Sequence, residues 1–197
     1  MASDVSTVRQ IQKILGKYGS LGMLALGLWL GGLAVPMAAL AGDAPTTEEV
    51  MAAQRRWGDA IAAIGAAYGS GGDYRALAAQ TVDDLYGYDE GPVLFKPTRA
   101  AALPFRGTEA EAVSYFVGGS VPEDHGFALQ PWSRVRFENA GIVTDGDSAI
   151  AMGRYYFTDA QTQEEVAVDY TFGYFKGDRG QVLINLHHSS LPYQSPH

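Results

Sequence analysis

The feature that most constrains this fold is a series of strand-like segments separated by short turn sequences. From about residue 128 the chain reads "LQPWSRVRFENAGIV", "SAIAMGRYYFTDA", "QTQEEVAVDYTFGYFK" and "QVLINLHHSS", with "TDGD" and "GDRG" among the connections. Asp-Gly and Gly-Asp pairs are typical of tight hairpin turns. We therefore expect an antiparallel meander rather than strands that alternate with crossover helices.

The chain before the meander carries helix signals. Thr46 with Glu49, and Thr108 with Glu111, have the spacing of a capping box. Apolar residues recur on one helical face after Thr46, "GSGG" ends that helix, and Asp73 is placed to cap a second one. Helices followed by a meander predict an α+β fold, in which a curved antiparallel sheet wraps over N-terminal helices.

The N-terminal segment differs from the rest of the chain. Three basic residues precede "GSLGMLALGLWLGGLAVPMAALA", an uncharged stretch that ends in an A-x-A motif. These are the parts of a secretory signal peptide, so we expect cleavage after Ala41 and export to the periplasm or an equivalent lumen. An uncleaved membrane anchor is the alternative, because about 20 apolar residues can span a bilayer. The expected organisation is a leader over 1–41, a linker over 42–47, a single domain over 48–193 and a tail over 194–197.

Composition narrows the function classes. The formal net charge is −8, and no basic stripe is available to neutralise phosphates, so nucleic acid is not expected as a partner. The chain has no cysteine, which excludes thiolate ligands, thiolate nucleophiles and disulfides. It also lacks a Gly-x-Ser-x-Gly elbow, a phosphate-binding loop and a dinucleotide fingerprint. The remaining expectation is a small ligand in a cavity lined by the aromatic residues of the strands, with no membrane partner after leader cleavage.

The last strand combines apolar and polar residues in a pattern that indicates a site. Strict alternation in "VLINLHHSS" places one set on a single face: Val182, Ile184, Leu186, His188 and Ser190. The apolar members mark this face as the interior, so we expect His188 and Ser190 to point into the cavity. His187 and Ser189 would then lie on the opposite face. Adjacent histidines on a strand cannot both reach one ion, so no metal ligand set is expected here.

Three motifs resemble those of the iota-class carbonic anhydrases: "FKPT" at 95–98, "SYFVGG" at 114–119 and "LHHSS" at 186–190. The resemblance extends from about residue 46 to residue 193, with Leu186 in place of the first histidine of the family's His-His-His-Ser-Ser signature. It implies a cone-shaped α+β barrel like that of nuclear transport factor 2 and the SnoaL cyclases, usually as a homodimer packed through the sheet. It also implies reversible hydration of CO2 to bicarbonate and a proton.

The resemblance further assigns a site. It implies that Thr98, Tyr115 and Ser190 hold bicarbonate, and that His188 fixes the serine or relays a proton. No cofactor is expected, although Zn and Mn stay open because the family includes metal-free and metal-dependent members. Two alternatives remain on the same fold: a non-enzymatic small-ligand binding or scaffold protein, and a SnoaL-type isomerase or cyclase. Asp169 has the parity of an outward-facing residue, which disfavours the cyclase because that reaction needs an inward acid or base.

Overall fold

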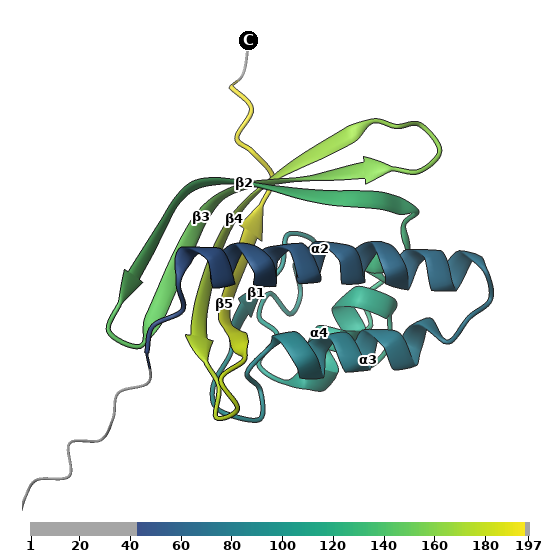
Figure 1. The fold of residues 1–197 in the computed structure, drawn as a ribbon. Coiled ribbons are helices and arrows are strands. Elements are labelled where there is room, and N and C mark those ends of the chain that lie inside the picture. Colours follow the sequence, from purple (N-terminus) through teal and green to yellow (C-terminus); the bar gives the residue numbers. More distant parts are fainter. Residues whose placement is uncertain (1–42, 196–197) are drawn as a thin grey trace, which may run out of the picture. The chain divides into compact units, whose positions relative to one another are not determined.

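A curved five-stranded sheet covered on one face by three α-helices forms the part of the chain that the structure describes (Figure 1). The computed structural model describes residues 43–195. The elements in chain order are α2 (Thr47–Gly69), α3 (Tyr74–Leu85), β1 (Leu94–Lys96), α4 (Glu109–Val117), the 3-10 helix η1 (Phe127–Leu129), β2 (Trp132–Asp145), β3 (Ser148–Asp159), β4 (Glu165–Lys176) and β5 (Val182–Ser190). The expected α+β order, with a meander after the helices, is confirmed.

The predicted leader, with its cleavage site after Ala41, lies outside the described residues. Within residues 43–195, no helix combines the length and apolar character needed to cross a membrane.

The order of strands in the sheet is β1-β5-β4-β3-β2. Strands β2 to β5 pair as an antiparallel meander, and the short β1 adds to β5 in parallel. Gly146 and Gly180 have φ of 59° and 79° in the two predicted turns, a left-handed conformation that glycine adopts readily. Because β1 and β2 form open edges, the expected cone takes the form of a curved sheet rather than a closed barrel.

Both predicted capping boxes are present. The Glu49 backbone N–H donates to Thr46 Oγ1 at 3.2 Å, and the Thr46 N–H donates to Glu49 Oε2 at 2.8 Å. Thr108 and Glu111 make the same reciprocal pair at the start of α4. Each such cap stabilises its helix by about 1 kcal/mol, so the starts of α2 and α4 are set locally.

The indole of Trp57, at the middle of α2, packs this helix against the sheet. Its side chain is 1% exposed. Six rings have centroids 5.5–6.4 Å from the indole: Phe116, Phe137, Tyr155, Phe157, Phe172 and His187. These rings come from α4 and from all four long strands, so Trp57 sits at the centre of the core and reaches His187 on β5.

Strand β5 does not alternate strictly, because Asn185 is an extra residue in it. Tyr174 of β4 pairs with Ile184, whereas its neighbour Gly173 pairs with Leu186, which leaves Asn185 unpaired in a β-bulge. A Cβ on Gly173 would lie 2.7 Å from Asn185 Oδ1 and 2.9 Å from Leu186 Cβ, so the bulge depends on a glycine opposite it. One extra residue reverses the facing of every later side chain.

Candidate active site

The bulge corrects the predicted facing of the polar residues on β5. His187 and Ser189 are 2% and 3% exposed and face the core, whereas His188 and Ser190 are exposed. The prediction that His188 and Ser190 point into the cavity is therefore wrong. These two residues line a groove on the outer face of the sheet. The inward polar pair keeps the predicted His-x-Ser spacing, moved by one residue.

Thr98 joins this inward pair. It follows β1, whose parallel pairing with β5 sets Lys96 opposite His188 and carries the chain on toward Ser189. Thr98 Oγ1 lies 2.8 Å from Ser189 Oγ, and Thr98 is half-buried while Ser189 is buried. The pair of hydroxyls thus lies at the boundary between the core and solvent.

Two tyrosines complete the group of hydroxyls. Tyr155 on β3 is hydrogen-bonded to Ser189, and burial raises the pKa of Tyr155 far above its ordinary value. Tyr115 on α4 is 5% exposed, and burial raises its pKa to about 12 despite a hydrogen bond from the Arg99 backbone that lowers it. A hydrogen bond that lowers the pKa of a phenol is one that the oxygen accepts. The hydroxyl proton of Tyr115 therefore remains available to a ligand.

His187 lies behind the hydroxyls in an apolar surrounding. Its ring stacks on Phe95 at a centroid distance of 4.5 Å, and Nδ1 lies 2.8 Å from Tyr86 Oη. Its Nε2 makes a longer contact of 3.5 Å with Tyr155 Oη. Burial, with a smaller contribution from the charge of His188, lowers the pKa of His187 well below its ordinary value. The imidazole is neutral across the physiological range.

Tyr115 also forms part of the wall of a surface cavity of about 290 Å³. The other residues lining this cavity are Arg99, Glu123, Asp124, His125, Gly126, Phe127 and Gln130. The Tyr115 ring stacks on the Phe127 ring at a centroid distance of 5.5 Å. The Arg99 guanidinium lies 6.0 Å from the centroid of the Phe127 ring. The cavity is at the small end of ligand pockets and offers a cation and an imidazole beside Tyr115.

An ion pair and hydrogen bonds to a carboxylate hold together the two loops around this cavity. The fully buried Arg106 pairs with Asp124 at 2.7 Å. The Glu123 carboxylate accepts hydrogen bonds of 2.8–3.0 Å from the backbone amides of residues 101–103. These bonds are the main reason that the pKa of Glu123 falls to about 2. The loop that follows Thr98 is therefore fastened to the loop that carries His125.

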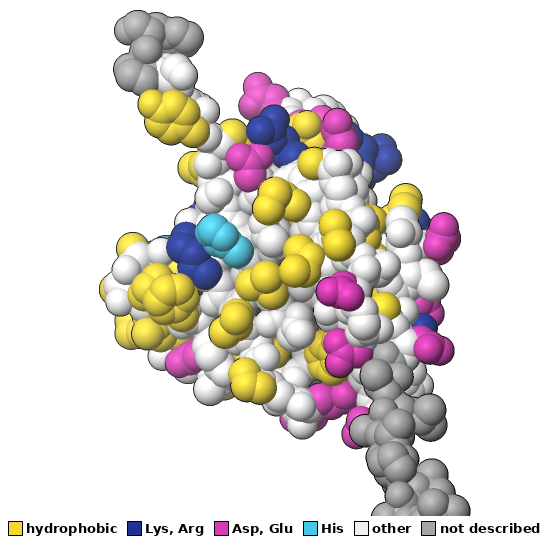
Figure 2. Space-filling view, turned by 90° about the vertical axis from the view of Figure 1, so that its left-hand side faces the viewer, with side chains coloured by type: hydrophobic (Ala, Val, Ile, Leu, Met, Phe, Trp, Pro, Cys, Tyr) yellow, Lys and Arg dark blue, Asp and Glu magenta, His cyan; other side chains and the backbone are white. Residues whose placement is uncertain are grey.

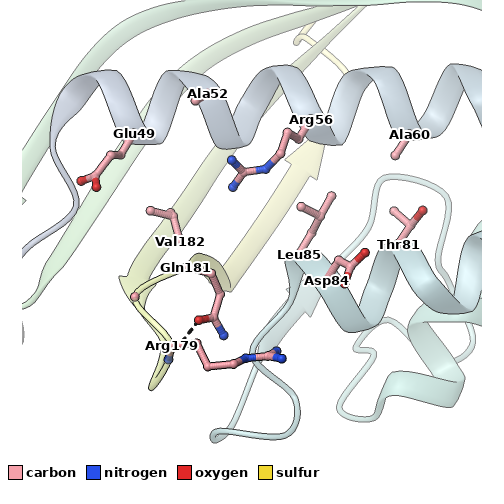
Figure 3. A pocket seen from close by; sticks show the side chains of 11 residues that line it. Glu49, Ala52, Arg56, Ala60, Thr81, Asp84, Leu85, Arg179, Gln181 and Val182 are labelled. Atoms are coloured by element: carbon pink, nitrogen blue, oxygen red, sulfur yellow. Dashed lines mark hydrogen bonds between the residues drawn. The ribbon is translucent and has the colours of Figure 1, made fainter.

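A second groove lies between α2, α3 and the β4–β5 turn (Figure 3). The guanidinium groups of Arg56 and Arg179 enter it, but so do the carboxylates of Glu49 and Asp84, and Glu49 pairs with Lys176 at 3.1 Å. The charges are of both signs, and no predicted site residue lines the groove. The cluster of hydroxyls formed by Thr98, Tyr115 and Ser189 is the better candidate site.

Sequence reasoning missed four of the residues now seen at the site: Tyr86, Tyr155, His187 and Ser189. The sequence held one signal for His187 and Ser189. The polar Asn185 follows the apolar run "VLI" of β5, and Gly173 lies opposite it in β4. No group of three or more histidine, aspartate or glutamate side chains placed to hold a metal ion occurs among residues 43–195.

Comparison with known proteins identifies the family of this chain. Residues 48–191 match the family model for metal-independent carbonic anhydrases. A metal-independent carbonic anhydrase from Nostoc sp. (strain PCC 7120 / SAG 25.82 / UTEX 2576) is 47% identical over 154 residues, which cover 76% of this chain and 75% of that protein. A cyanobacterial iota-carbonic anhydrase, crystallised with bicarbonate, is 46% identical with a TM-score of 0.73, over 76% of this chain and 94% of the other. The chain therefore belongs to the metal-independent carbonic anhydrase family.

Proposed function

We propose that this protein catalyses the reversible hydration of CO2 to bicarbonate and a proton at Thr98, Tyr115 and Ser189, with His187 behind them. The observation that carries the proposal is the 2.8 Å contact between Thr98 and Ser189, on two segments that only the fold brings together. It occurs in a chain 46% identical to an iota-carbonic anhydrase that was crystallised with bicarbonate.

The chemistry follows from the positions of these groups. Hydration needs a water beside the carbon of CO2, and donors for the oxygens that gain negative charge as the new C–O bond forms. Phe95 and Phe127 flank Tyr115 at 5.7 and 5.5 Å and supply an apolar wall for CO2. The hydroxyls of Thr98, Tyr115 and Ser189 orient the water and then donate to bicarbonate. No metal ion takes part in this scheme, in agreement with the family's description as metal-independent.

The proton released in the reaction leaves by a route other than His188. That side chain lies on the outer face of the sheet, and His187 is buried among rings. His125 is exposed on the wall of the cavity that it shares with Tyr115. Imidazole is the side chain best suited to exchange protons with buffer near neutral pH, so His125 carries the proton to bulk solvent.

The alternatives on the same fold are less well supported. A cyclase or isomerase needs an inward acid or base, but Asp169 lies on the outer face and pairs with Arg154 at 2.8 Å. A binding or scaffold protein does not require a row of inward hydroxyls beside a buried neutral imidazole.

The direct test is stopped-flow CO2 hydration by the wild-type protein, Thr98→Val and Tyr115→Phe. We expect each variant to keep its fold and lose about 10²-fold in kcat, the cost of removing one donor from a preorganised site. Tyr68→Phe is the matched control, because Tyr68 is 49% exposed at the end of α2 and should have no effect. Wild-type rates in both site variants would show that the site is misplaced.

The outer face of the sheet supports a homodimer. The strand pairing aligns one row of residues across all five strands: Val143, Ile150, Gly173, Leu186 and Leu94. Val143, Ile150 and Leu94 are 68%, 51% and 67% exposed, and Figure 2 shows hydrophobic side chains spread across this side of the molecule. A second copy of the chain would cover the row by a symmetric contact, which removes this apolar surface from water.

The oligomeric state tests the homodimer. We expect light scattering to give twice the chain mass for the wild type and the monomer mass for Ile150→Lys. Met51→Lys is the control, because Met51 is also exposed (41%) but lies on α2. A monomeric wild type would refute the proposed contact.

We propose that the protein is exported to the periplasm or an equivalent lumen. This proposal is supported by the three-part leader in the sequence, with cleavage after Ala41. Mass spectrometry of the protein from its native host should find a chain that begins at residue 42. An intact N-terminus would contradict cleavage and favour the anchor.

A further inference from the structure

We propose that Trp57 and Tyr86 are positioning residues that hold His187 in the neutral tautomer with its proton on Nε2. In this form the imidazole always presents an N–H donor, never a lone pair, to the hydroxyls of the site. The catalytic consequence rests on the proposed function, whereas the tautomer itself can be tested without any activity.

The chain of contacts begins in α2. Trp57 Nε1 lies 2.9 Å from Tyr86 Oη, and Tyr86 Oη lies 2.8 Å from His187 Nδ1. All three side chains are at most 2% exposed, so water does not substitute for a missing partner. Tyr86 occupies the C-cap position of α3, where that helix ends, so three separate elements meet at this point.

The direction of the bonds follows from the donors available. An indole N–H can only donate, so the Tyr86 oxygen accepts from Trp57. If His187 also donated from Nδ1, the Tyr86 hydroxyl proton would be left buried without an acceptor, at a cost. The arrangement that satisfies every group has Tyr86 donating to Nδ1. The imidazole proton must then be on Nε2.

The described residues around His187 are consistent with this assignment. Phe95, Phe172 and Trp57 pack on the ring with centroids 4.5, 4.0 and 5.5 Å away. Among residues 43–195, no carboxylate is hydrogen-bonded to this ring, unlike a histidine that an aspartate orients. Nε2 faces Tyr155 Oη at 3.5 Å, and Tyr155 is hydrogen-bonded to Ser189.

The consequence is that His187 acts only as a donor toward the site. Protons point from Trp57 to Tyr86, from Tyr86 to His187, and from His187 to Tyr155. Tyr155 then accepts from both His187 and Ser189, and Ser189 accepts from Thr98. Because a hydroxyl rotates to suit its partners, Ser189 and Thr98 can turn their protons toward an anionic ligand when it binds. The arrangement suits the oxygens of bicarbonate and excludes His187 as the general base.

The test reads the tautomer directly by nitrogen NMR of the ¹⁵N-labelled full chain. The unprotonated ring nitrogen resonates far downfield of the protonated one, and His188→Ala identifies the signals of the neighbouring imidazole. We expect His187 in the wild type to have a bare Nδ1 and a protonated Nε2. In Tyr86→Phe the two nitrogens should move toward averaged shifts, and kcat should fall about tenfold, as for one lost hydrogen bond.

Tyr88→Phe is the matched control. Tyr88 stacks beside Tyr86 and donates to the Arg106 carbonyl at 3.0 Å, so this variant loses an equivalent bond without touching His187. Its His187 shifts and kcat should match the wild type. A wild-type His187 protonated on Nδ1, or unchanged shifts in Tyr86→Phe, would overturn the tautomer assignment. Averaged shifts with an unchanged kcat would overturn the positioning role, and an inactive wild type with the expected spectrum would refute the proposed function alone.

Discussion

Ser189→Ala and Ser190→Ala form the sharpest pair of substitutions in this chain. The two residues are adjacent, identical in chemistry and opposite in facing, because of the bulge at Asn185. Ser189 contacts Thr98 at 2.8 Å inside the site, and Ser190 is exposed on the outer face. Removing one donor from a preorganised site costs about 10²–10³-fold in kcat, or about 2.7–4 kcal/mol of transition-state stabilisation. We expect that loss for Ser189→Ala and no loss for Ser190→Ala.

The cost in stability should be smaller than the cost in rate. After Ser189→Ala, the half-buried Thr98 can turn its hydroxyl to water, and Tyr155 keeps its contact with His187. The free energy of unfolding should therefore fall by about 1 kcal/mol, the low end for a broken buried hydrogen bond. Stopped-flow CO2 hydration and urea denaturation of both variants measure the two effects. A rate loss in Ser190→Ala with a normal Ser189→Ala would refute the assigned facing of β5.

Three further predictions concern the bulge, the loops and the proton route. Gly173→Ala should lower the free energy of unfolding by about 1–3 kcal/mol in urea denaturation, because its Cβ would overlap Asn185 and Leu186. Gly141→Ala is the control, since a Cβ there meets nothing within 4 Å. Equal effects of the two substitutions would contradict the reasoning. The folded-state pKa of Glu123 is lowered to about 2, so its contribution to stability is present above about pH 4.5 and lost as the pH falls toward 2. The difference in Tm between wild type and Glu123→Gln should shrink over that range, and a difference independent of pH would contradict it. His125→Ala should lower kcat about tenfold in weak buffer and recover with added imidazole, with kcat/KM unchanged; no rescue would argue against His125 as the proton carrier.

The elements that local sequence determines were predictable. The capping boxes at Thr46 and Thr108, the cap at Asp73 and the glycine turns of the meander each depend on residues a few positions apart. The outward facing of Asp169 was also predicted correctly, because β4 alternates without interruption up to that point. Thr98 and Tyr115 were named from the family resemblance, and their roles stay predictions; the structure shows Thr98 beside Ser189 and Tyr115 on the wall of a surface cavity.

The facing of β5 was not predictable by counting along one strand. Whether Asn185 is paired or bulged depends on which residues of β4 lie opposite, and the pairing changes between Gly173 and Tyr174. The contacts of His187 depend in the same way on distant segments, since Tyr86 is 101 positions away in sequence. Long-range pairing, rather than local propensity, therefore decides which histidine and which serine enter the core.

The measurement that tests the central claim most directly is CO2 hydration by chelator-treated protein, with elemental analysis of the same sample. The account predicts full activity at a metal content far below one ion per chain. Activity that disappears with chelation and returns with Zn or Mn would contradict a reaction carried by the hydroxyls of Thr98, Tyr115 and Ser189, and so would a treated and an untreated protein that both fail to exceed the buffer rate.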